Sequence, residues 1–138
     1  MVLVDTSVWI DVFRRPARVQ LEDHVDFDEV VTCLMVIQEV LQGFDREADF
    51  RRAHEAMWAL PLVESPLRPE IIDDAVDLYR RARRAGLTVR SGVDCLIAAC
   101  ALRHNLEVLH VDRDFASLSR ISQLDSTDLR RQARRLSP

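Results

Sequence analysis

With 138 residues, 48% of them hydrophobic, the chain fits one domain with a substantial core, and no segment approaches the roughly 20 apolar residues that would cross a membrane. The three cysteines form no C-x-x-C pair and all 19 basic residues are Arg, which argues against a disulfide framework, a zinc site and a P-loop lysine. The formal net charge of -4 at pH 7 is by itself unfavourable for a nucleic-acid partner.

Short apolar strands alternate with helical patterns in the first half of the chain. Three strands are predicted there, at residues 2–4, 29–33 and 62–63. Three helices are predicted, at residues 7–15, 34–44 and 46–60. Pro16 ends the first helix and Gly43 closes the second, which is apolar on most of its circumference. Because Met1 leads directly into the first strand, we expect a cytoplasmic protein without a secretory signal.

The second half continues the alternation. A helix is predicted over residues 69–85, since acidic residues occupy its first turn and Arg residues its last, complementing the helix dipole. A mostly apolar helix over 91–105, a strand over 107–111 and a helix beginning near Phe115 follow. Such alternation is typical of a parallel sheet covered by helices. Residues 125–138 read as an Arg-rich tail, which could be a short helix, a partner-binding arm or a frayed end.

Two acids follow predicted strands directly. Asp5 comes after the first strand and Asp112 after the strand over 107–111. In an open parallel sheet, ligands bind at the carboxyl ends of strands where the strand order reverses, so these carboxylates would face each other if the two strands flank that point. Asp5 could equally serve as a helix N-cap, and Asp112 and Asp114 could cap the helix near Phe115.

Two further acids interrupt apolar helices. Glu39 has no Arg three or four positions away on its own helix, and a carboxylate is costly to bury unless something neutralises it. Asp94 has a stronger local explanation, because Ser91 and Asp94 match a capping box and Arg90 is close enough for an ion pair. Four such acids at one end of a sheet need protons or cations to offset their charge, and an all-oxygen set favours Mg²⁺ or Mn²⁺.

The segments "VLVDTSVWID", "VIQEVLQGF" and "RSGVDCLIAACALRHNLEVLHVDRDF" resemble the PIN-domain ribonucleases, specifically the VapC-type toxins of bacterial type II toxin–antitoxin pairs. The resemblance implies a single three-layer α/β/α domain over residues 1–124, with a central parallel sheet of four to five strands. It also implies a homodimer and a cognate antitoxin whose terminal segment blocks the acidic groove. The catalytic and metal-binding positions implied are Asp5, Glu39, Asp94 and Asp112. Asp114 matches an occasional further acid, and Thr6 or Ser7 an accessory hydroxyl.

We therefore expect an endoribonuclease that depends on Mg²⁺ or Mn²⁺ and acts as a toxin. The alternative is a PIN-fold module that binds RNA or protein with a weak or idle metal site. A phosphotransfer protein of the receiver or haloacid-phosphatase type is disfavoured, because both need a Lys that this chain lacks.

The arginines are clustered despite the acidic net charge. If four of the 23 acids hold metal, 19 remain against 19 Arg. We call the group Arg80, Arg81, Arg83 and Arg84 the first arginine cluster, and a second cluster spans residues 130–135. Solvated helix faces are the default interpretation of either one. The first arginine cluster and Arg90 are our candidates for RNA binding, because clustered Arg can neutralise phosphates.

Overall fold

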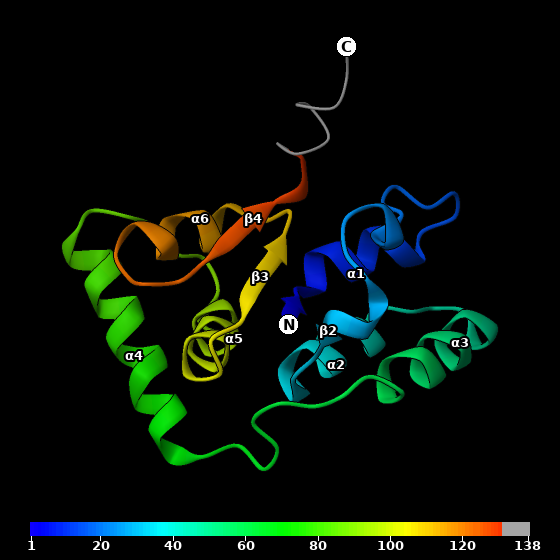
Figure 1. Cartoon of the computed structure of the whole chain (residues 1–138), viewed down its shortest axis with the longest axis horizontal. Helices are drawn as coiled ribbons and strands as arrows, with labels where there is room; N and C mark the ends of the chain where they lie inside the picture. Colours follow the sequence, from blue (N-terminus) through cyan, green and yellow to red (C-terminus); the bar gives the residue numbers. More distant parts are fainter. Residues whose placement is uncertain (131–138) are drawn as a thin grey trace.

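The computed structural model describes residues 1–130 and places four parallel strands in the order β2-β1-β3-β4 (Figure 1). The strands are β1 (Val2–Val4), β2 (Val30–Val31), β3 (Glu107–His110) and β4 (Ser126–Asp128). The sheet confirms the predicted α/β class and a sheet of four to five strands. Since β1 pairs with β2 on one side and β3 on the other, the first strand of the chain lies at the centre.

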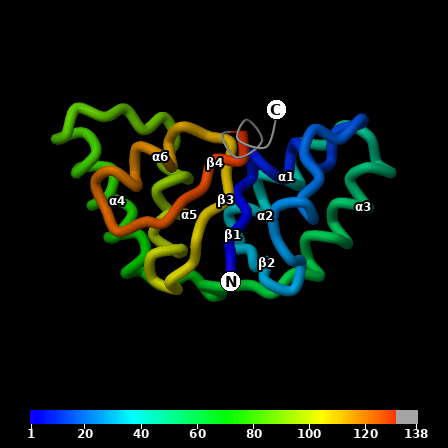
Figure 2. Tube along the Cα trace, turned by 45° about the horizontal axis from the view of Figure 1, so that its top comes forward, coloured from blue at the N-terminus to red at the C-terminus, as the bar shows by residue number. Residues whose placement is uncertain are grey.

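Within residues 1–130, six helices surround the sheet. They are α1 (Thr6–Phe13), α2 (Leu34–Leu41), α3 (Glu47–Trp58), α4 (Pro69–Arg84), α5 (Gly92–Arg103) and α6 (Arg113–Arg120), with two 3₁₀ turns, η1 (Leu21–Asp23) and η2 (Phe27–Glu29). Both views show α1–α3 gathered on one side of the molecule and α4–α6 on the other, with the strands between them (Figures 1 and 2). No helix among the described residues is long and apolar enough to span a membrane.

β1 and α5 contribute many fully buried residues to the core. Leu3 and Val4 of β1 are fully buried, as are Ala98, Ala99 and Cys100 of α5. These small side chains let α5 approach its neighbours closely, which explains why a helix with almost no amphipathic pattern folds stably here. The helix therefore carries the residues of its first turn into the interior.

Two helices begin earlier than predicted, for the same reason. The Asp5 carboxylate accepts the backbone N–H of Ser7 at 3.0 Å, so α1 begins at Thr6. The Asp112 carboxylate accepts the N–H of Asp114 at 3.0 Å, so α6 begins at Arg113 instead of near Phe115. Both acids thus act as the N-caps that their local sequence allowed.

The C-terminal segment requires a correction. We expected residues 125–138 to form a tail outside the domain, but Ser126–Asp128 is β4, an edge strand that pairs in parallel with β3 from Val108↔Ser126 to His110↔Asp128. This part of the segment therefore belongs to the sheet. Residues 131–138, with most of the second arginine cluster, lie outside the described residues. The strand predicted at 62–63 is reduced to one bridge between Thr32 and Leu62.

Candidate metal centre

The carboxyl ends of β1 and β3 lie side by side, as predicted. Val4 is in register with Leu109, and the Asp5 N–H donates to the Leu109 carbonyl at 2.9 Å. Asp5 follows β1 directly and Asp112 follows β3 by two residues. The two acids therefore lie at the carboxyl ends of adjacent strands, which is the edge where parallel sheets bind ligands.

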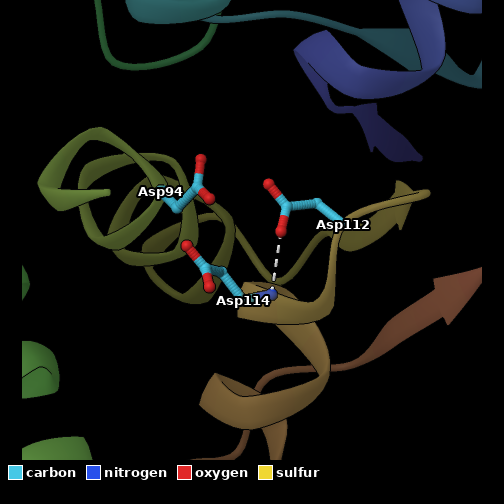
Figure 3. Close-up of side chains that lie close together, drawn as sticks. All are labelled: Asp94, Asp112 and Asp114. Carbon is cyan, nitrogen blue, oxygen red and sulfur yellow. Dashed lines mark hydrogen bonds between the residues drawn. The ribbon is translucent and has the colours of Figure 1, made fainter. Parts of the chain in front are cut away.

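Three carboxylates converge beside these strand ends (Figure 3). Asp94 from the first turn of α5, Asp112 and Asp114 each offer an oxygen, and these oxygens lie within 4.8 Å of one another. Oδ1 of Asp112 accepts the α6 N–H of Asp114, which leaves its second oxygen for a ligand. A set of hard oxygen donors from two elements suits a divalent cation of the Mg²⁺ or Mn²⁺ type.

Two buried carboxylate oxygens have no hydrogen-bond partner in the part of the chain that the structure describes. Asp94 Oδ2 and Asp5 Oδ1 make no hydrogen bond within residues 1–130, although the two residues are only 5% and 2% exposed. The capping-box alternative for Asp94 is not realised, because Ser91 occupies the N-cap position but makes no side-chain capping bond. A buried unpartnered oxygen is costly. A cation held by the three converging carboxylates would give the Asp94 carboxylate a partner, so these residues fit the metal that the resemblance implies.

Burial and neighbouring negative charges raise the pKa of two of these acids, Asp5 and Asp94. Burial raises the pKa of Asp5 to about 6, against hydrogen bonds from Ser7 that lower it. Burial, and next the charges of Asp5 and Asp112, raise the pKa of Asp94 to about 9. Carboxyls that cannot all ionise together mark a place where positive charge is missing.

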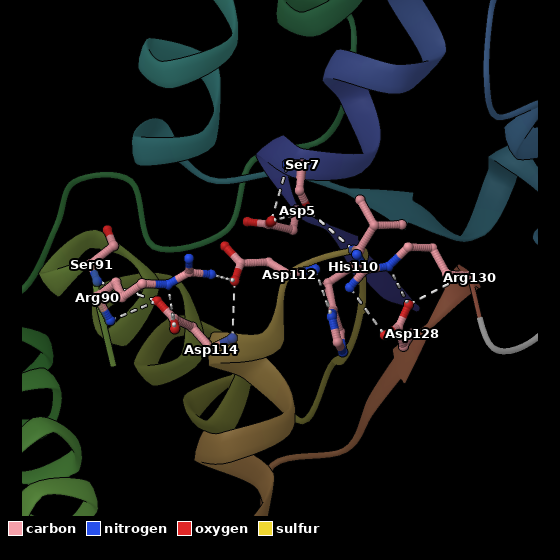
Figure 4. Close-up of polar contacts among 10 residues, drawn as sticks. Asp5, Ser7, Arg90, Ser91, His110, Asp112, Asp114, Asp128 and Arg130 are labelled. Carbon is pink, nitrogen blue, oxygen red and sulfur yellow. Dashed lines mark hydrogen bonds and ion pairs between the residues drawn. The ribbon is translucent and has the colours of Figure 1, made fainter. Parts of the chain in front are cut away.

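Ser7 and Thr6 connect the acids to the fold. Ser7 Oγ donates to Asp5 Oδ2 at 2.6 Å and accepts the Val111 N–H at 3.1 Å (Figure 4). It thereby joins the β1–α1 turn to the β3–α6 turn. Thr6 Oγ1 donates to Glu39 Oε1 at 2.9 Å, which anchors the half-buried Glu39 of α2 at the end of β1. Glu39 is not in the group of three converging carboxylates.

Asp114 has a second role that sequence reasoning missed. Its Oδ2 accepts the backbone N–H groups of Arg90 at 3.0 Å and Ser91 at 3.2 Å, and so fixes the loop that enters α5 (Figure 4). The Arg90 guanidinium lies 3.7 Å from Asp112 and 3.8 Å from Asp114. The sequence suggested an ion pair between Arg90 and Asp94, but the structure pairs Arg90 with Asp112 and Asp114 instead.

His110 was also missed. This buried residue of β3 accepts the Asp112 N–H on Nδ1 at 3.2 Å, and burial lowers its pKa. A neutral ring is the form that can accept this hydrogen bond. The only available signal was a polar residue inside an apolar strand, two positions before Asp112.

The first arginine cluster lies at the end of α4 and is exposed. Arg81 already pairs with Asp77 at 3.6 Å and contacts the Ile121 carbonyl. The role of the first arginine cluster in RNA binding stays a prediction. A cavity of about 490 Å³ between α1, α2 and α3 is larger than the cavity of about 240 Å³ that includes Asp114. Because its only acid, Asp49, pairs with Arg15 and Arg52, it lacks the chemistry of the carboxylate group.

Comparison with known proteins identifies the family. The PIN domain model matches residues 2–121. The chain is 33% identical to ribonuclease VapC11 of Mycobacterium tuberculosis, over 94% of this chain and 100% of that protein. The chain therefore belongs to the PIN-domain family, among its VapC-type members.

Solved structures agree with this assignment. VapBC-5 of M. tuberculosis has the same fold, with a TM-score of 0.69 at 23% identity, covering 91% of this chain and 95% of that one. A toxin–antitoxin complex from Klebsiella pneumoniae matches with a TM-score of 0.65 at 25% identity, covering 84% of this chain and 91% of that one.

Proposed function

We propose that this chain is an endoribonuclease that hydrolyses RNA phosphodiester bonds with Mg²⁺ or Mn²⁺ and acts as the toxin of a toxin–antitoxin pair. The observation that carries the proposal is the convergence of Asp94, Asp112 and Asp114 beside two buried carboxylate oxygens that have no partner among residues 1–130. The ribonuclease named among the relatives, which this chain matches along that protein's full length, supports the choice of RNA.

The proposed ligands are Asp5, Glu39, Asp94 and Asp112, with Asp114 as a further candidate. A divalent cation held there would lower the pKa of a bound water and offset charge that develops on the phosphate. The protein residues supply the positioning. Ser7 orients Asp5, Thr6 orients Glu39, and the Asp114 carboxylate fixes the loop before Asp94. One carboxylate would also accept the proton of the attacking water.

A cognate antitoxin and a homodimer belong to the same proposal. Support for the antitoxin comes from the solved structure described as a toxin–antitoxin complex, which this chain matches at 25% identity. The homodimer rests on the family resemblance. A cytoplasmic location follows from the proposed RNA substrate. Purification together with the product of the neighbouring reading frame would test the antitoxin proposal. A cognate antitoxin should co-purify with this chain and suppress its RNA cleavage.

A binding module with an idle metal site is the second candidate function. Asp114 gives it specific support, because one of its oxygens already accepts two backbone N–H groups and is less free to bind metal. The two candidates differ in one assay. The nuclease should cleave mixed RNA with Mg²⁺ or Mn²⁺ and stop in EDTA, and Mg²⁺ should raise its melting temperature. Metal-loaded protein that binds RNA without cleaving it would establish the binding module, and full activity in EDTA would refute the metal mechanism.

A further inference from the structure

A second, cationic cavity adjoins the carboxylates. It has a volume of about 240 Å³ and is lined by Thr88, Arg90, Arg113, Asp114 and Ser117. Since liquid water occupies about 30 Å³ per molecule, the space equals roughly eight waters, enough for a hydrated anionic group. Asp114 belongs both to this cavity and to the converging carboxylates. Anything bound in the cavity would therefore lie next to the candidate metal centre.

The polar groups of this cavity are available to a ligand. Within residues 1–130, the side chains of Arg113, Thr88 and Ser117 make no hydrogen bond or ion pair. Arg113 and Ser117 are four positions apart on α6 and so share one helix face. The Arg90 guanidinium forms ion pairs of 3.7 Å with Asp112 and 3.8 Å with Asp114, which are longer than good hydrogen bonds, so Arg90 can turn part of its donor set toward a ligand while Arg113 supplies the unpaired cation.

The acid in the cavity offsets only one of its two cations, because Arg90 pairs with Asp114 and Arg113 has no ion-pair partner among residues 1–130. Asp114 Oδ2 is occupied by two backbone N–H groups, and the carboxylate is 3% exposed. Two guanidinium groups and two hydroxyls then face the cavity against one largely covered carboxylate. Guanidinium groups recognise phosphate in a bidentate manner, and hydroxyls add neutral donors. The ligand that fits is a phosphate.

We propose that this cavity binds a non-scissile phosphate of single-stranded RNA, held by Arg113 and Arg90 with Thr88 and Ser117, beside the cleavage site. The inference rests on the proposed function and extends it. It states where the RNA strand continues beyond the cleaved bond, namely from the carboxylates into this cavity. RNA is favoured over an acidic protein segment since the cavity shares Asp114 with a centre proposed to act on a phosphodiester, and the neighbouring phosphate of the same strand is close by necessity.

The test compares Arg113→Gln with Arg113→Lys, each made in an Asp94→Asn background to prevent cleavage of the probe. The probe is a fluorescently labelled, mixed-sequence, single-stranded oligoribonucleotide, and its affinity is measured over a series of salt concentrations. Loss of one phosphate contact should reduce the slope of log affinity against log salt by about 0.7. It should also weaken binding roughly tenfold at low salt. Arg113→Lys should keep the slope, because it keeps the charge.

Arg51→Gln is the matched control. Arg51 is an exposed Arg of α3 that makes no hydrogen bond or ion pair within residues 1–130, and Figures 1 and 2 place α3 on the opposite side of the molecule from α6. With Asp94 restored, Arg113→Gln should raise the KM for RNA cleavage about tenfold and change kcat less than about threefold. Arg51→Gln should change neither.

Three results would overturn the inference. If the Arg113→Gln protein binds the oligoribonucleotide with unchanged affinity and unchanged salt slope, Arg113 does not contact the RNA. Inorganic phosphate that binds as tightly as the oligoribonucleotide and depends on Arg113 would make the cavity a free-anion site. Polyglutamate that competes with equal strength would assign the cavity to an acidic protein segment. The proposed function fails separately: a wild-type protein that binds RNA through Arg113 but never cleaves it would refute the nuclease and support the phosphate site.

Discussion

Asp94→Asn should stabilise the metal-free protein at neutral pH while abolishing RNA cleavage. The pKa of Asp94 rises from 3.8 to about 9 on folding. A carboxyl with a higher pKa in the folded state binds protons more tightly there, so stability is lost as pH rises between these two values. At pH 7 the lost stability is about 1.36 kcal/mol for each of roughly three pH units, or about 4 kcal/mol.

Asn removes this penalty because it does not ionise in the unfolded chain. Its amide can still donate a hydrogen bond toward Asp112 and Asp114, which interact with the protonated Asp94 side chain. We expect a gain of about 2–4 kcal/mol at pH 7 and less than about 0.5 kcal/mol near pH 4. At about 3 °C per kcal/mol for a chain of this size, the melting temperature should rise by about 6–12 °C at pH 7.

Circular dichroism melts of metal-free protein near pH 4 and pH 7 would measure this difference. Asp73→Asn, at an exposed position on α4, is the control and should change the melting temperature by no more than about 2 °C at either pH. With Mg²⁺ present, wild type should gain stability and cleave RNA. Asp94→Asn should gain little and cleave at least about 100-fold more slowly, because Asn lacks the charge that a hard cation needs. A variant that is less stable at pH 7, or equally stabilised near pH 4, would refute the electrostatic reasoning.

Two further changes test the supports of the site. Ser7→Ala removes the hydroxyl that joins Asp5 to the Val111 N–H and should lower the free energy of unfolding by about 1–2 kcal/mol in urea titrations; an unchanged value would show that the bridge is not stabilising. Replacing all four residues of the first arginine cluster by Gln should weaken RNA binding and reduce its salt slope by up to about 2.8, at about 0.7 per phosphate contact. An unchanged salt slope would show that the first arginine cluster is only a solvated helix face.

The order of elements could be predicted because each carries a local signal. Apolar runs marked β1 and β3, and Pro69 and Gly86 bounded α4. The placement of Asp5 and Asp112 at one edge followed from a rule about parallel sheets. β4 could not be predicted, because the sequence Ser-Thr-Asp has neither apolar alternation nor buried residues and becomes a strand only by pairing with β3.

The contacts that position the acids could not be predicted from the sequence, for a related reason. Ser7 and Val111 are 104 positions apart in the chain, and Asp114 reaches back 24 and 23 positions to Arg90 and Ser91. No periodicity or spacing encodes such contacts. The acids themselves were conspicuous because apolar surroundings make a carboxylate expensive, whereas a hydroxyl or a polar strand residue has ordinary explanations everywhere.

The central position of β1 makes the timing of synthesis part of how the site forms. β1 is translated before its partner β3, which begins about 100 residues later, a delay of about 5–20 s at about 5–20 residues per second. Until then Asp5 and Ser7 have neither Val111 nor the Asp112 turn beside them. A chain interrupted before β3 holds only Asp5, Glu39 and Asp94 of the acids, without the strand that brings them together. Translation products that end before β3 should therefore be inert, and the complete site should first exist once β3 and the turn that carries Asp112 have been made.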